Sequence, residues 1–127
     1  EYAMALKKRV LIVDDEIETL ETIQRMLNRL DFEVFVASKG ADTLRLAKQH
    51  KPDIIVLDYY LGDMRGDEVK QELSEDEDTA LIPTLFLTGM LTKEDESFLK
   101  TVHDRVHALA KPVTREELVQ AINALLG

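Results

Sequence analysis

Short apolar runs alternate with amphipathic stripes along the chain, and this alternation is the strongest constraint on its fold. Each run is too short for a helix and is rich in β-branched or aromatic residues. Three runs lack alternating polar residues, which is typical of strands covered on both faces of a parallel sheet. Clear runs lie at 10–13, 54–57 and 85–87, and weaker ones at 34–37 and 106–110.

Between these runs, apolar residues recur at spacings of three and four, which predicts helices. Two Thr-x-x-acid patterns indicate helix N-caps, one from Thr92 to Asp95 and one from Thr114 to Glu117. The strict alternation of strand and helix favours one α/β sandwich with right-handed crossovers. The apolar stripes fall at 20–30, 41–47, 69–73, 98–102 and 118–126.

The composition suits one globular domain and excludes several classes of function. The chain has 127 residues, of which 45% are hydrophobic and 32% charged, and this length fits a single domain. A net charge of -9 argues against nucleic-acid binding, which needs clustered Lys and Arg. The absence of cysteine excludes disulfides, thiolate metal sites and cysteine nucleophiles. With no membrane-length apolar run and no secretory stretch near the start, we expect a cytoplasmic protein.

Polar side chains stand at the ends of four predicted strands, where ligands bind in such sheets. These side chains are Asp14, Asp15, Asp58, Thr88 and Lys111. A single Asp there is usually a turn or cap residue, so the combination carries the prediction. Three crowded carboxylates repel one another, and a divalent cation removes the conflict. Because the ligands offered are hard oxygens, they favour Mg²⁺ or Mn²⁺ over zinc.

The same edge carries groups that complement a metal-bound dianion. Lys111 supplies a positive charge and Thr88 a hydroxyl donor, which suggests a phosphoryl group with a carboxylate nucleophile. Asp58 is the best candidate nucleophile because a glycine-containing loop follows it. Gly62 and Gly66 allow that loop to turn tightly.

These motifs resemble the receiver domain of two-component response regulators. The resemblance runs from about Arg9 to Leu126 and rests on four separated blocks in the family's order, at 10–16, 52–58, 82–89 and 110–113. It implies a flavodoxin-like (βα)5 three-layer sandwich with a five-stranded parallel sheet in the order 2-1-3-4-5. Residues 9–127 are then the receiver domain, and residues 1–8 an N-terminal extension.

The resemblance also implies a reaction and its partners. Asp58 would accept a phosphoryl group from a sensor histidine kinase or a phosphotransfer protein. Lys111 would pair with Asp58 and then with a phosphoryl oxygen, and Thr88 would bond the phosphoryl group. The domain would relay its state to an output domain or downstream protein. It would not be an enzyme with a separate substrate, and we expect no direct contact with nucleic acid or membrane.

The cofactor that the resemblance implies is Mg²⁺. Asp15, Asp58 and the main-chain carbonyl of Tyr60 would bind the ion directly, and Asp14 would act mainly through a metal-bound water.

The sequence departs from the family's pattern near the predicted site. Ala108 stands where the family usually has Tyr or Phe, which predicts a muted or rerouted response across the fourth helix, fifth strand and fifth helix. Tyr60 and Met90 offer no carboxylate or amide to orient water, which predicts slow self-dephosphorylation.

Three alternatives compete with this interpretation. A pseudo-receiver would keep the fold as a protein-binding module without phosphorylation, and Ala108 is its best support. A phosphatase of the haloacid dehalogenase type needs a second Asp where this chain has Tyr60, and a substrate cap. A flavodoxin needs a Ser/Thr-rich phosphate loop after its first strand, where this chain instead has Asp14, Asp15 and Glu16. The cognate kinase, the output domain and a homodimer are left open by the sequence.

Overall fold

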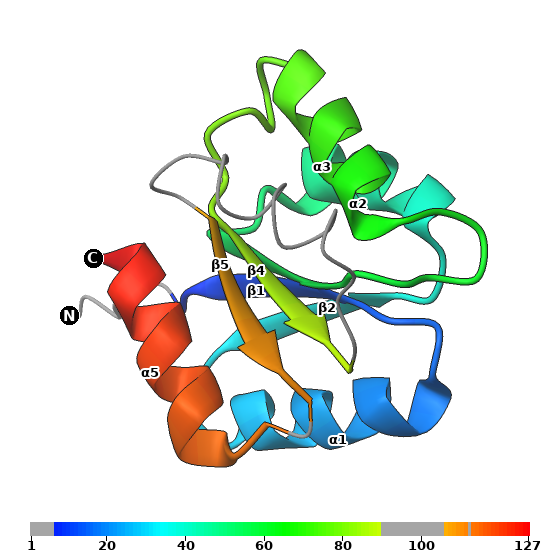
Figure 1. The fold of residues 1–127 in the computed structure, drawn as a ribbon. Helices are drawn as coiled ribbons and strands as arrows, with labels where there is room; N and C mark the ends of the chain where they lie inside the picture. The colour runs from blue at the N-terminus through cyan, green and yellow to red at the C-terminus, as the bar shows by residue number, and fades with distance from the viewer. Residues whose placement is uncertain (1–6, 90–105, 112) are drawn as a thin grey trace, which may run out of the picture.

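The computed structural model describes residues 7–89, 106–111 and 113–127, and these form a parallel sheet flanked by helices. Figure 1 shows the sheet between two helical layers. Its strand order is β2-β1-β3-β4-β5, as the family resemblance implies for a flavodoxin-like sandwich. All five predicted runs are strands: β1 (Arg9–Val13), β2 (Glu33–Ala37), β3 (Ile54–Asp58), β4 (Thr84–Thr88) and β5 (Val106–Ala110).

The helices cover the two faces of the sheet in pairs. Helices α1 (Ile17–Asn28) and α5 (Arg115–Leu126) lie on one face. The turn η1 (Gly40–Asp42) leads into α2 (Thr43–His50), which lies with α3 (Gly66–Glu75) on the other. None of these helices is both long and apolar enough to span a membrane. The stripe at 98–102, its cap pattern from Thr92 to Asp95, and Met90 lie outside the described residues.

Two apolar clusters, one on each side of the sheet, explain why the strands lack polar alternation. Successive strand residues point to opposite faces, so each central strand supplies both clusters. One cluster joins the sheet to α1 and α5 and includes Val10, Ile12, Ile54, Val56, Leu85 and Leu87. The other joins it to α2 and α3 and includes Leu11, Val13, Ile55, Leu57 and Phe86. Every residue of β3 is buried, which confirms a strand covered on both faces.

The predicted cap of α5 is confirmed in full. The Glu117 amide donates to Thr114 Oγ1 at 3.1 Å, and the Thr114 amide donates to Glu117 Oε1 at 2.9 Å. This reciprocal pair satisfies two backbone donors that a helix start leaves without partners. It sets the start of α5 a few residues after β5.

Strand register brings distant polar residues to one edge. Thr88 is level with Ala110 across β4 and β5, and the Lys111 amide donates to the Thr88 carbonyl at 2.8 Å. Asp58 is level with Leu87 across β3 and β4. Because all strands run parallel, their carboxyl ends meet at the same edge, as predicted.

The loop after β3 depends on a glycine. The Gly66 amide donates to the Tyr59 carbonyl, and a Cβ at Gly66 would lie 2.8 Å from Phe86 Cε1 and 2.9 Å from Tyr59 Cα. Contacts this short involve a buried ring and backbone that cannot easily shift.

We therefore expect Gly66→Ala to lower the free energy of unfolding by about 1–3 kcal/mol, because the added methyl group overpacks the interior. Urea denaturation measures the change. Gly89→Ala is the matched control, since a Cβ at Gly89 meets no atom within 4 Å. Equal unfolding midpoints for the two variants would contradict the close approach at Gly66.

Candidate functional site

Three carboxylates converge at the carboxyl edge of the sheet. Asp14 and Asp15 follow β1, and Asp58 is the last residue of β3. One carboxylate oxygen from each of the three residues lies within 4.8 Å of the other two. Asp14 is 2% exposed and Asp58 8%, whereas Asp15 faces solvent. The structure thus brings the three predicted acids together.

Lys111 is the cation of this cluster. Its Nζ lies 2.7 Å from Asp14 Oδ2, 3.4 Å from Asp58 Oδ2 and 3.6 Å from Glu16 Oε1. The resemblance implied pairing with Asp58, but the shorter contact in this structure is with Asp14. Asp14 is 2% exposed, and this close cation offsets the cost of burying its charge.

The other predicted residues border the cluster. Thr88 is buried at the end of β4, where its carbonyl accepts the Lys111 amide. The Tyr60 amide donates to Asp58 Oδ1 at 3.4 Å, while the Tyr60 side chain is 40% exposed. The edge therefore presents the Thr88 hydroxyl at the end of β4, the Lys111 ammonium just after β5 and the Asp58 carboxylate at the end of β3.

The environment perturbs the two central titratable groups. Burial and the charge of Asp14 raise the pKa of Asp58 to about 6, and the nearby Lys111 only partly offsets this. Burial by itself would lower the pKa of Lys111, but the hydrogen bond to Asp14 and the charges of both acids raise it. The site thus carries more negative charge than its own lysine neutralises.

The donor set fits Mg²⁺. The cluster offers carboxylate oxygens alone, which are hard ligands suited to Mg²⁺ rather than zinc. Asp58 is also hindered from ionising by a neighbouring acid, and a divalent cation would relieve that repulsion. Asp14, Asp15 and Asp58 are the side chains that could hold such an ion.

Asp63, which no sequence pattern singles out as a functional residue, supports the loop that carries Tyr60. Its Oδ1 accepts the Gly40 amide and its Oδ2 the Ala41 amide, both at 2.9 Å. These backbone hydrogen bonds lower the pKa of Asp63. Asp63 thereby ties the loop after β3 to the start of η1. Its position just after Gly62 signals a turn, but nothing in the sequence indicates its distant partners.

Ala108 leaves no aromatic side chain on β5 at the position where the family usually has one. Ala108 is exposed and lines a cavity of about 320 Å³ together with Leu109 and residues of α5, namely Glu117, Gln120, Ala121 and Ala124. The rerouted response that we infer from Ala108 stays a prediction.

Comparison with known proteins identifies the family. The family model described as the response regulator receiver domain matches residues 10–123. The chain belongs to this family. Receiver domains are modules of two-component signalling rather than enzymes that act on a separate substrate. The acidic cluster at the sheet edge therefore suggests the phosphorylation site.

Curated relatives cover nearly all of the chain. Protein PilH of Pseudomonas aeruginosa is 33% identical over 119 residues, which are 94% of this chain and 98% of PilH. The alkaline phosphatase synthesis transcriptional regulatory protein PhoP of Bacillus subtilis is 34% identical over 95% of this chain, which spans 49% of PhoP. The receiver domain is thus similar both to a protein of its own length and to part of a longer regulator.

Solved structures agree with this assignment. The chemotaxis protein CheY4 of Vibrio cholerae has a TM-score of 0.86 and 26% identity, and the match covers 94% of this chain and 99% of CheY4. The receiver domain of sensor histidine kinase PA1611 of Pseudomonas aeruginosa, solved with a magnesium ion in its active site cleft, has a TM-score of 0.85 and 25% identity. That match covers 96% of this chain and 99% of the other.

Because the charges at the site are crowded, we expect replacement of Asp58 to change the free energy of unfolding in a pH-dependent way. The pKa of Asp58 is about 6 when folded, above its ordinary value of 3.8, so its ionisation destabilises the folded state increasingly as the pH rises from 3.8 to about 6 and fully above that. We expect Asp58→Asn to raise the free energy of unfolding by up to about 3 kcal/mol above pH 7 in EDTA. The gain should shrink through the window between the two values and vanish near pH 4.

Chemical denaturation of both proteins across this range measures the difference. Asp31→Asn is the control, because Asp31 is exposed and precedes β2 at the opposite edge of the sheet. A gain that persists at pH 4 would show that its cause is not the charge of Asp58.

Proposed function

We propose that this receiver domain is a phosphorylation-dependent switch with Asp58 as its phosphoryl acceptor. The observation that carries the proposal is the position of Asp58 at the sheet edge. It lies among three clustered carboxylates and 3.4 Å from the Lys111 ammonium. Lys111 and Thr88 complete the reactive group, and the relationship to the response regulator family supports the assignment.

The proposed transfer is an in-line displacement at phosphorus. A carboxylate oxygen of Asp58 forms a bond to the phosphorus of a phosphohistidine, and the P–N bond breaks with its electrons leaving on the imidazole. Lys111 stabilises the negative charge on the phosphoryl oxygens and the Thr88 hydroxyl donates to one of them. Because Asp14 already holds Lys111 at 2.7 Å, the ammonium is positioned beside Asp58 before the donor arrives.

Mg²⁺ is the proposed cofactor, held by Asp15, Asp58 and the Tyr60 carbonyl, with Asp14 acting through water. When bound, it would neutralise the crowded oxygens and the incoming phosphoryl group. The acidic cluster supports this assignment because its three oxygens are already gathered within 4.8 Å.

The proposed partners follow from this chemistry. The donor is a sensor histidine kinase or phosphotransfer protein, and the phosphorylated state is relayed to an output domain or downstream protein, with a homodimer as one route. We propose a cytoplasmic location and a domain spanning residues 9–127, preceded by an extension over residues 1–8.

Incubation with acetyl phosphate and Mg²⁺ tests the acceptor. We expect the intact mass to rise by one phosphoryl group, and we expect no gain in Asp58→Asn, which lacks the nucleophilic oxygen. Lys111→Ala should slow the gain by about tenfold or more, because one charge-stabilising group is lost. Asp31→Asn, at the opposite edge, should be phosphorylated like the native chain.

An unchanged mass for the native chain, together with no response to a beryllofluoride phosphoryl mimic, would favour the pseudo-receiver alternative. Equal phosphorylation of the native chain and Asp58→Asn would place the acceptor elsewhere.

Tyr60 tests the proposed lifetime of the phosphorylated state. Its phenol side chain cannot orient a water molecule for attack as an amide can, so we expect Tyr60→Asn to shorten the phosphorylation half-life by about threefold or more. Decay of the phosphorylated protein by intact mass gives the rate, and Tyr60→Phe controls for loss of the hydroxyl. A native half-life shorter than that of Tyr60→Asn would contradict the hypothesis.

A further inference from the structure

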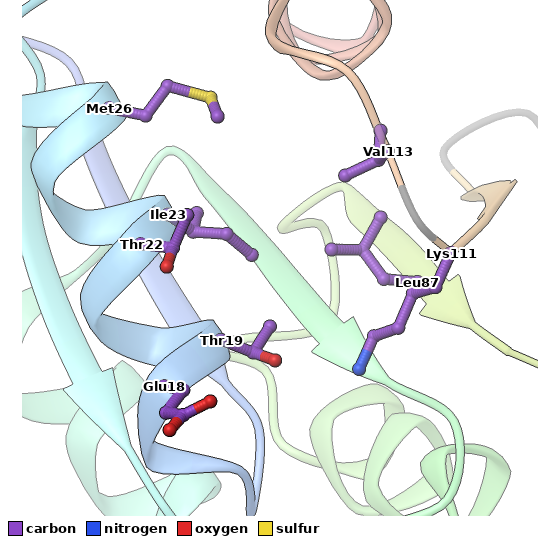
Figure 2. A pocket seen from close by; sticks show the side chains of 8 residues that line it. All are labelled: Glu18, Thr19, Thr22, Ile23, Met26, Leu87, Lys111 and Val113. Carbon is purple, nitrogen blue, oxygen red and sulfur yellow. The ribbon is translucent and has the colours of Figure 1, made fainter.

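A cavity lies between α1 and the strands beside it, next to the acidic site but with a different character. Its volume is about 430 Å³. Figure 2 shows α1 on one side of this space and Leu87, Lys111 and Val113 on the other. Ile23 and Met26 add apolar surface, and the Lys111 stem lines the cavity while its ammonium binds Asp14. This cavity therefore offers apolar contacts to a ligand.

A second cavity of about 440 Å³ adjoins the first, and it is strongly basic. The two cavities share Thr22 and Met26, so they form one groove along α1. The other lining residues are Arg25, Arg29 and Arg115. All three arginines are exposed. Within the described part of the chain, none of their guanidinium groups forms a salt bridge or a side-chain hydrogen bond.

The placement of Arg115 does not follow from helix stability. Arg25 and Arg29 lie at the carboxyl end of α1, where positive charge complements the helix dipole. Arg115 is instead the first residue of α5, where the dipole disfavours a cation and favours an anion. Three like charges thus line one cavity, and none of them pairs with a carboxylate of the residues that the structure describes, in a chain whose net charge is -9. A bound anion would offset this repulsion.

We propose that this groove binds a small phosphorylated molecule with an apolar body. The guanidinium groups of Arg25, Arg29 and Arg115 would hold the phosphate, because guanidinium matches phosphate in charge and in bidentate geometry. The apolar body would lie over Met26 toward Val113. The groove borders the acidic cluster and shares Lys111 with it, but the proposed binding does not depend on phosphorylation of Asp58.

Binding can be measured by NMR titration of the whole chain in EDTA with three probes. Pyrophosphate supplies the anionic head alone, adenosine diphosphate adds a planar body, and octyl phosphate adds an aliphatic one. We expect amide shifts centred on Thr22, Arg25, Arg29 and Arg115. At least one body-bearing probe should saturate below about 1 mM and bind about tenfold more tightly than pyrophosphate.

Variants test the contacts to the phosphate and the contacts to the apolar body separately. Arg115→Gln should weaken all three probes by about tenfold, because it removes one charge-assisted contact. Met26→Gln should weaken only the probes with an apolar body. Arg45→Gln is the matched control, since Arg45 is an exposed arginine on α2 at the other face of the sheet. Urea denaturation confirms that each variant is folded.

The proposal would be overturned if no probe saturates by about 10 mM, or if Arg115→Gln binds like Arg45→Gln. Equal affinity for all three probes would likewise overturn it, because the apolar part of the groove would then make no contribution.

Discussion

The functional edge of this domain depends on an imbalance of charge, in which one partly buried ammonium stands among clustered acids. Lys111 lies 2.7 Å from Asp14 and 3.4 Å from Asp58. Since β3 and β4 separate β1 from β5 in the sheet, this contact joins the ends of two strands that are not neighbours. Interactions between enclosed charges are strong because water screens them poorly. The lysine therefore holds the edge together but does not neutralise it, and Asp58 keeps a raised pKa.

A site under such repulsion needs a rigid frame. The sheet provides it, because β3 and β4 are fully buried between the two apolar clusters. The loop after β3 adds two further constraints, namely the close approach at Gly66 and the two amide hydrogen bonds of Asp63. Packing therefore holds the carboxylates in positions that their own charges oppose. Binding of a cation or transfer of a phosphoryl group would lower the free energy of an arrangement that already exists.

Helix α1 separates two regions of opposite charge. Asp14 and Asp15 of the functional site precede its first turn, whereas Arg25 and Arg29 stand at its carboxyl end. The apolar groove runs between them and contacts the stem of Lys111. Ala108, by contrast, lies on the outer strand β5 beside a smaller cavity. The domain thus has a reactive edge and, on the α1 face, a separate surface of different chemistry.

Sequence patterns were enough to predict the strands, the start of α5 and the residues at the reactive edge. This was possible because these features rest on local patterns: apolar runs, helical spacing, and the cap formed by Thr114 and Glu117. The packing of the folded chain, in contrast, places Lys111 nearer to Asp14 than to Asp58 and lets Asp63 tie its loop to η1. The groove lined by three arginines likewise arises from helices that are distant in the chain. Side-chain partners depend on which elements pack together and how deeply each charge is buried, and no local pattern of residues encodes either quantity.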